Sequence, residues 1–281
     1  IFLHTNHVIG LGEGTPYSST LCRDYRKILN VGTSINNLHV ALARERLIKI
    51  ERKFLEKTWK IEWGSYLALE GALLDIIGKI RKVRVAEVLG GVYRDKIKVW
   101  GTIFLNSPKR MHSRALSWLN KGVNFIKIKI PCNLTGLEKI LRSLSPIVRD
   151  YNIVLRADAN ECFKHINKAL KALKLMEHYG VSIVEQPMPR EKILETKMLQ
   201  KAFASSLEVM LDESVVHPNI IDYIAQNEIV NSINIHPSKF GCLTITREAI
   251  LKAQKLGLKV QIGSALMTEI GLAQYLHLAA S

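Results

Sequence analysis

The stretch VLRADAN at residues 154–160 is an apolar run that ends in an acidic residue. Two later stretches repeat this pattern, IVEQP at 183–187 and VMLDES at 209–214. Their carboxylates follow one another at equal intervals of 27 residues: Asp158, Glu185 and Asp212. Such an interval accommodates one helix and two loops between successive parallel strands. The pattern therefore predicts one carboxylate at the end of each of three neighbouring strands in a barrel.

A second motif lies upstream, where FIKIKI at 125–130 places Lys127 and Lys129 two residues apart. Side chains two apart on a strand point to the same side of the sheet, so both ammonium groups are expected to face the carboxylates. Clustered carboxylates are hard oxygen ligands that suit Mg²⁺ or Mn²⁺. A lysine beside such a dication can act as a base, because its pKa is lowered. The alternative interpretation is structural: solvated carboxylates at strand ends and two lysines on an edge strand.

Strands and helices alternate over most of the chain. Apolar runs predict seven strands, at 98–105, 125–130, 153–158, 182–187, 208–213, 232–236 and 259–264, with amphipathic helices between them. Before them, apolar residues at helical spacing predict helices at 38–57 and 65–82, and residues 1–18 are expected to be extended with a turn. We therefore predict an α/β fold, with an α+β capping domain over 1–96 and a TIM-type (β/α) barrel over 97–281.

Length and composition exclude several classes of protein. The 281 residues, 47% of them hydrophobic, suffice for a barrel and a small accessory domain. No apolar run approaches the roughly 20 residues of a membrane span, and the N-terminus lacks the features of a secretory signal. We therefore expect a cytoplasmic protein with no membrane partner. The cysteines lie far apart in the sequence and form no CxxC pair, which predicts free thiols: Cys22, Cys132, Cys162 and Cys242.

The chain is strongly basic, with 40 Lys and Arg against 25 Asp and Glu, a formal net charge of +15. Such a charge can attract nucleic acid or anionic substrates. The basic residues are dispersed, however, often beside acidic ones, and no basic block alternates with aromatic residues. We interpret the charge as a solvated basic surface and expect no nucleic-acid partner.

Seven motifs together carry a resemblance to a known family. In chain order they are GLGEGTP at 10–16, EVLGG at 87–91, KIK at 127–129, DAN at 158–160, EQP at 185–187, DES at 212–214 and INIHPSKFG at 233–241. In these motifs and their order the chain resembles the enolase superfamily, in its muconate-lactonising and dipeptide-epimerase subgroup. The resemblance spans nearly the whole chain.

The resemblance implies a fold with more strands than the sequence predicts. An eight-stranded barrel is implied, whereas only seven barrel strands are predicted here. A strand that precedes the GLGE segment in the family is also not visible. We therefore expect either an incomplete sequence or a shortened relative. Homo-oligomer formation is a further expectation from the resemblance.

The resemblance also implies roles for particular residues. Lys129 would be the base that removes a proton α to a carboxylate, and Lys127 would contact that carboxylate and lower the pKa of Lys129. The implied ligands of Mg²⁺ or Mn²⁺ are Asp158, Glu185 and Asp212. Asn160 would orient a metal-bound water or ligand, and Glu213 would hold a lysine by charge pairing. Glu13 would serve either a capping-domain contact or the substrate.

Two positions depart from the family pattern. His236 stands where the subgroup usually has a lysine facing Lys129 across the substrate, with Lys239 three residues later. Because a racemase needs acid/base groups on both faces, His236 is a candidate for the second group; a non-catalytic replacement is the alternative. Met267 stands where the subgroup often has a glutamate.

The implied activity is metal-dependent removal of an α-proton from a small-molecule carboxylate, with stabilisation of the enediolate. Racemisation or epimerisation of a dipeptide or N-acyl amino acid is the first hypothesis. A dehydratase similar to o-succinylbenzoate synthase, or a cycloisomerase, with Lys129 as the single base is the second. A catalytically silent relative that serves as a binding protein is the third.

Overall fold

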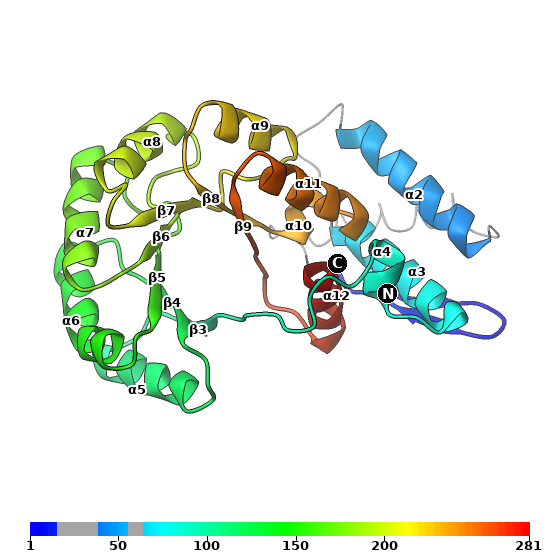
Figure 1. Cartoon of the computed structure of the whole chain (residues 1–281), viewed down its shortest axis with the longest axis horizontal. Coiled ribbons are helices and arrows are strands. Elements are labelled where there is room, and N and C mark those ends of the chain that lie inside the picture. Colours follow the sequence, from blue (N-terminus) through cyan, green and yellow to red (C-terminus); the bar gives the residue numbers. More distant parts are fainter. Residues whose placement is uncertain (16–38, 56–63) are drawn as a thin grey trace.

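A seven-stranded parallel sheet forms the centre of the molecule (Figure 1). The computed structural model describes residues 1–15, 39–55 and 64–281. The strands pair in chain order and are β3 (Gly101–Ile103), β4 (Phe125–Lys129), β5 (Val154–Asp158), β6 (Ile183–Glu185), β7 (Glu208–Leu211), β8 (Ser232–Ile235) and β9 (Lys259–Ile262). Their register sets Lys129 opposite Asp158 and Asp158 opposite Glu185. The carboxyl ends of these strands therefore meet at one edge of the sheet.

Helices follow the strands and lie on the convex outer side of the curved sheet (Figure 1). They are α5 (Pro108–Leu119), α6 (Leu134–Asp150), α7 (Ile166–His178), α8 (Ile193–Ala202), α9 (Asn219–Gln226) and α11 (Leu243–Lys255). The short α10 (Pro237–Phe240) follows β8 and packs against α3, and α12 (Glu269–Ala280) follows β9. Polar side chains cap several helix N-termini, as where Asn133 accepts a hydrogen bond from the Gly136 N–H at the start of α6. Within the described ranges, no helix combines the length and apolarity needed to cross a membrane.

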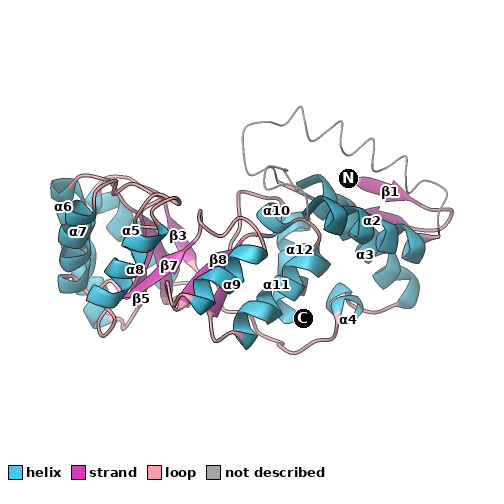
Figure 2. Ribbon diagram, turned by 90° about the horizontal axis from the view of Figure 1, so that it is seen from above, coloured by secondary structure: helices cyan, strands magenta, loops and turns pink. Residues whose placement is uncertain are grey.

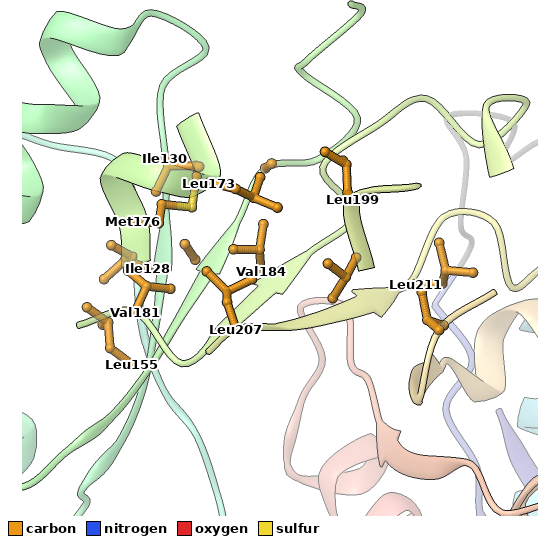
Figure 3. Close-up of a cluster of buried hydrophobic side chains, with 14 of the residues drawn as sticks. Ile128, Ile130, Leu155, Leu173, Met176, Val181, Val184, Leu199, Leu207 and Leu211 are labelled. Carbon is orange, nitrogen blue, oxygen red and sulfur yellow. The ribbon is translucent and has the colours of Figure 1, made fainter. Parts of the chain in front are cut away.

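The main hydrophobic core lies between the sheet and these helices (Figure 3). Ile128 and Val184 point outward from their strands and pack with side chains such as Leu173 of α7. Alternate residues of the same strands, including Lys127 and Arg156, point to the inner side, because side chains alternate between the faces of a strand. Burial of the apolar face thus directs the charged residues of β4 and β5 inward.

The predicted fold is confirmed, although the first barrel strand is shorter than predicted. Each predicted barrel strand is present, but the first is shorter than residues 98–105 and spans Gly101–Ile103. Within the described residues β3 and β9 each pair with a single neighbour, so the sheet is a curved, open one. Cys22 and parts of the expected segments 1–18 and 38–57 lie outside the described residues. The described cysteines are free thiols, as predicted.

The N-terminal part is a small α+β layer beside the barrel. Strands β1 (Phe2–His4) and β2 (Ile9–Leu11) form an antiparallel pair, followed by α2 (Val40–Leu55), α3 (Gly64–Arg81) and α4 (Val85–Leu89). The glycines of GLGEG allow this chain segment to approach α3 closely. A Cβ atom at Gly12 would lie 1.9 Å from the Ala68 carbonyl oxygen, and one at Gly10 would lie 2.2 Å from the Ala72 carbonyl oxygen. Any larger residue at these positions would push the β-pair away from the helix.

Carboxylates of the N-terminal layer bind the N-termini of two helices of the barrel part. At α11, Glu51 accepts hydrogen bonds from the Cys242 N–H at 3.0 and 3.1 Å, and Glu70 accepts one from the Thr244 N–H at 3.1 Å. At α12, Glu13 accepts hydrogen bonds from the Thr268 and Gly271 N–H groups, each at 2.9 Å. These carboxyl oxygens accept hydrogen bonds from N–H groups that have no partner within the helix.

These contacts show a structural role for Glu13. They join the layer to α11 and α12, which lie between the sheet and the N-terminal layer when the molecule is seen from above (Figure 2). The N-terminal layer is therefore attached to the barrel part through polar contacts as well as apolar ones.

Glu51 should make the stability of the protein depend on pH. Its carboxyl group is fully buried, and this burial raises its pKa to about 8. The folded state then holds a proton that the unfolded state releases, so this contribution to stability is complete below the unfolded pKa and is lost as the pH rises towards 8. We expect wild-type stability to fall relative to Glu51→Gln by up to about 1.4 kcal/mol per pH unit between roughly pH 5 and 8. Urea unfolding of both proteins at several pH values measures this, and parallel curves would contradict it.

Candidate active site

The predicted site residues gather at the carboxyl-terminal edge of the sheet. Lys127 and Lys129 lie on β4, Asp158 ends β5 and Glu185 ends β6. Asp212 and His236 directly follow β7 and β8. Five adjacent strands thus present two ammonium groups, three carboxylates and an imidazole. In barrels of this kind, the carboxyl-terminal edge is where active sites are found.

The two lysines of β4 contact two of the three carboxylates. The Lys127 Nζ lies 2.6 Å from Asp158 Oδ2 and 2.8 Å from Glu185 Oε1, and so bridges them. The Lys129 Nζ lies 2.6 Å from Asp158 Oδ2 and 2.7 Å from Asn160 Oδ1. Burial alone would lower the pKa of Lys127, but the charges of Glu185 and Asp158 outweigh it and raise this pKa. Lys127 is therefore held in its charged form.

Glu185 is fully buried and contacts two residues that the sequence pattern did not indicate. Its Oε2 lies 3.2 Å from Arg156 Nε, and its Oε1 accepts a hydrogen bond from the Asn234 amide at 3.0 Å. Burial raises the pKa of Glu185, while the charges of Arg156 and Lys127 act in the opposite direction. A buried carboxylate requires such partners because its desolvation is costly.

Arg156 is itself fully buried on the inner side of the sheet. Its guanidinium carbon lies 4.2 Å from the centroid of the Trp100 ring, and its Nη1 hydrogen-bonds Gln261. It thereby connects Glu185 on β6 with Gln261 on β9. The sequence contained a signal for this role, namely an arginine within the apolar run VLRADAN. Because side chains two apart on a strand share a face, Arg156 could have been predicted to lie on the same face as Asp158.

Asp212, the third carboxylate, is contacted by Lys239 and His236, which both follow β8. The Lys239 Nζ lies 2.5 Å from Asp212 Oδ1 and also donates to the Asp212 carbonyl oxygen at 2.6 Å. The His236 Nε2 lies 3.2 Å from the same Oδ1. Burial by itself would raise the pKa of Asp212, but His236 and Lys239 hold it well below its usual value. The buried Gln186 fixes the backbone here, since its Oε1 accepts the Asp212 N–H at 2.8 Å.

His236 is buried beside β9. Burial lowers its pKa, which favours the neutral imidazole. The ring fits because residue 263 is a glycine: a Cβ atom at Gly263 would lie 2.2 Å from His236 Nε2. The His236 side chain therefore has a defined place on the side of the three carboxylates opposite to Lys129.

Asn160 and Glu213 both lie at this edge of the sheet and contact each other. Asn160 accepts from Lys129, donates its own N–H to Asp158 Oδ1 at 3.0 Å, and donates its amide to Glu213 Oε1 at 2.9 Å. Glu213 was expected to pair with a lysine and instead contacts this amide. Asn160 itself has a φ of +42° at the start of a turn, and its side chain lies across the edge between Lys129 and Glu213.

The donor set suits a divalent cation. In the described part of the chain, no three His, Cys, Asp or Glu side chains are arranged as a ready metal cluster. Instead, ammonium groups lie against each of the three carboxylates at 2.5 to 2.8 Å. Three adjacent carboxylates need positive charge between them, and hard oxygen donors suit Mg²⁺ or Mn²⁺. The residues therefore fit such a cation by charge and by ligand type.

Comparison with known families agrees with this geometry. A family model described as Enolase C-terminal domain-like matches residues 110–281. The chain belongs to the enolase superfamily. The matched region begins in α5 and includes every residue of the candidate site, so the resemblance inferred from the motifs is confirmed.

Curated members of the superfamily show moderate identity to this chain. An L-Ala-D/L-Glu epimerase of Bacillus subtilis is 28% identical over 221 residues, and an o-succinylbenzoate synthase of the same organism is 32% identical over 212 residues. These alignments cover 76% and 75% of this chain, but 58% and 54% of the relatives. The chain therefore spans little more than half the length of these two enzymes.

Solved structures of the superfamily share the fold. A dipeptide epimerase of Enterococcus faecalis, complexed with Mg and the dipeptide L-Leu-L-Tyr, superposes with a TM-score of 0.87 at 24% identity. The superposition covers 99% of this chain and 78% of that chain. The described N-terminal layer and the curved sheet therefore adopt the arrangement of this superfamily.

Arg156 should be important for stability because it neutralises Glu185 in the interior. Replacing Arg156 by Met removes one partner of a buried ion pair, and we expect the free energy of unfolding to fall by about 3 kcal/mol. Arg142→Met is the matched control, because Arg142 pairs with Glu138 on the exposed face of α6 and its loss should change stability little. Urea unfolding at pH 7 measures both variants. Equal stability of the two variants would show that the buried pair contributes no more than the exposed one.

Proposed function

We propose that this enolase-superfamily protein removes the α-proton of a small-molecule carboxylate and returns a proton to the opposite face, as a racemase or epimerase of a dipeptide or N-acyl amino acid. The observation that supports this proposal is that Lys129 and His236 flank the three carboxylates, one on β4 and the other after β8. A substrate held at the carboxylates would lie between two groups that can exchange protons. Relatives with racemase and epimerase names support the same reaction class.

Asp158, Glu185 and Asp212 would hold Mg²⁺ or Mn²⁺. When bound, such a cation would polarise the substrate carboxylate and stabilise the negative charge that develops when the α-proton leaves. Arg156 and Asn234 would keep Glu185 in place. Gln186 would keep the backbone of Asp212 in place.

Lys129 and His236 would move the proton. In the resting protein the imidazole of His236 is favoured in its neutral form, which can accept a proton. The Lys129 ammonium group can donate one, and Asn160 orients it through the 2.7 Å hydrogen bond. Removal by His236 and return by Lys129 would convert one enantiomer, and the reverse sequence would convert the other. Lys127, which is held charged, would bind the substrate carboxylate.

A reaction with Lys129 as the single base is the second candidate. The observations that favour it are the histidine at position 236 and the 32% identity to an o-succinylbenzoate synthase. In that reaction His236 would only position Asp212, which it contacts at 3.2 Å. The two candidates differ in whether His236 itself takes up a proton.

Exchange of the substrate α-proton with deuterium tests the role of Lys129. We expect NMR in D₂O with Mg²⁺ to show exchange in a panel of dipeptides, N-acyl amino acids and succinylbenzoate precursors. Lys129→Ala should slow exchange of one enantiomer by about 10²- to 10⁴-fold, because its general base is lost. Lys121→Ala, at an exposed position outside the site, is the control and should exchange at the wild-type rate. Absence of exchange with every substrate, in a folded protein that binds Mg²⁺, would favour a silent relative.

The same measurement on His236→Gln separates the two candidate reactions. With two acid/base groups, this variant should lose exchange of the enantiomer that Lys129→Ala still exchanges, because each group serves one face. Lys129→Ala should then keep exchange of the other enantiomer. If Lys129→Ala loses all exchange and His236→Gln loses none, the single-base reaction is correct and racemisation through His236 is wrong. Circular dichroism of each variant confirms that the fold is intact.

A further inference from the structure

Two cysteines that are distant in the sequence leave adjacent strands at the same edge of the sheet. Cys132 lies three residues after Lys129 at the end of β4, and Cys162 lies four residues after Asp158 at the end of β5. Lys129 and Asp158 are paired in the parallel ladder, and the Ile130 N–H continues it by donating to the Asp158 carbonyl oxygen at 3.2 Å. The two cysteines are thus brought together beside the candidate active site.

The two thiols are neighbours at this edge. Cys132 is exposed, whereas Cys162 is half-buried. Burial raises the pKa of the Cys162 thiol, and the neighbouring Cys132 raises it further. The proposed reaction uses neither thiol. An exposed thiol beside a second, more buried one is the arrangement in which the first can react with an external reagent and the second can then displace that reagent.

Backbone hydrogen bonds hold Cys162 in place, and Cys132 lies at the start of a helix. The Cys162 N–H donates to the Ala159 carbonyl oxygen at 3.0 Å, and the next residue, Phe163, donates to the Pro187 carbonyl oxygen at 3.1 Å. Cys132 directly precedes Asn133, the N-cap of α6. The proximity of the two cysteines is therefore a product of the folded structure, because their chain segments lie at the ends of regular elements.

We propose that Cys132 and Cys162 are a redox-active dithiol, which a small-molecule disulfide such as oxidised glutathione converts into an intramolecular disulfide. The Cys132 thiolate attacks one sulfur of the reagent, its S–S bond breaks, and one reagent thiolate leaves. The Cys162 thiolate then attacks the Cys132 sulfur and displaces the second reagent thiolate. The two protein thiols are oxidised by two electrons, and the reagent is reduced to two thiols that take up the two protons.

This disulfide would join the loops that follow β4 and β5. It would close a ring over residues 132–162 that contains α6, and would tie the turn of Asn160 to the loop after Lys129. Cross-linking of such a ring restricts the unfolded chain and so stabilises the folded one. The inference does not depend on the proposed reaction, because it concerns only the chemistry of the two thiols.

Mass spectrometry without reduction tests the proposal directly. The folded, fully reduced protein is incubated with oxidised glutathione, the remaining thiols are blocked, and the protein is digested with trypsin. Cleavage after Lys129 and Lys139 releases one cysteine as IPCNLTGLEK, and cleavage after Arg156 and Lys164 releases the other as ADANECFK. We expect these two peptides joined by a disulfide. The peptide of the buried Cys242, FGCLTITR, is the internal control and should carry only the blocking group.

Variants with a single cysteine replaced by serine show which of the two thiols reacts first with oxidised glutathione. Cys162→Ser should stop the reaction at a mixed disulfide of glutathione on Cys132, and Cys132→Ser should react much more slowly. Recovery of the two wild-type peptides unlinked, either blocked or each bearing glutathione, would overturn the proposal.

Thermal unfolding gives an independent readout. The midpoint of the oxidised wild-type protein should rise by roughly 5 °C and return after reduction, and Cys162→Ser should show no such rise. A midpoint that oxidised glutathione leaves unchanged, as in Cys162→Ser, would also overturn the proposal, because no cross-link would have formed. Disulfide formation in a protein that shows no α-proton exchange would contradict the proposed function alone.

Discussion

Burial of negative charge at the ends of adjacent strands is the constraint on which the rest of the site depends. Asp158 and Glu185 are almost completely removed from solvent, and their repulsion must be offset within the protein. Lys127 bridges the two from β4, and Arg156 contacts Glu185. Because these carboxylates repel one another and need positive charge nearby, they are also suitable ligands for a dication.

Buried acidic side chains also attach the N-terminal layer to the barrel part. Carboxylates of this layer, including the buried Glu51 and Glu70, bind N–H groups at the start of α11, and Glu13 does so at α12. Helix α11 begins only a few residues after His236 and Lys239. The attachment of the layer and the position of the groups around Asp212 are therefore parts of one continuous segment of chain.

Local pattern predicted the strands and the candidate site because both follow from regular spacing. The two-residue period of β4 placed Lys127 and Lys129 on one face, and equal intervals placed Asp158, Glu185 and Asp212 at one edge of the sheet. The contacts among side chains were less predictable. Glu213 contacts the amide of Asn160, a residue with positive φ, and no sequence pattern specifies this contact.

The sequence by itself determined the order of the elements, the family and the faces of the strands, because these depend on short-range periodicity and on motifs read along the chain. Only the tertiary structure decided which distant groups meet. Lys239 reaches Asp212, Arg156 lies against Trp100, and the segments of Cys132 and Cys162 leave paired strands at the same edge. The physical reason is that these contacts depend on how neighbouring strands are aligned and on the loops that follow them, and a spacing along one chain segment does not contain that information.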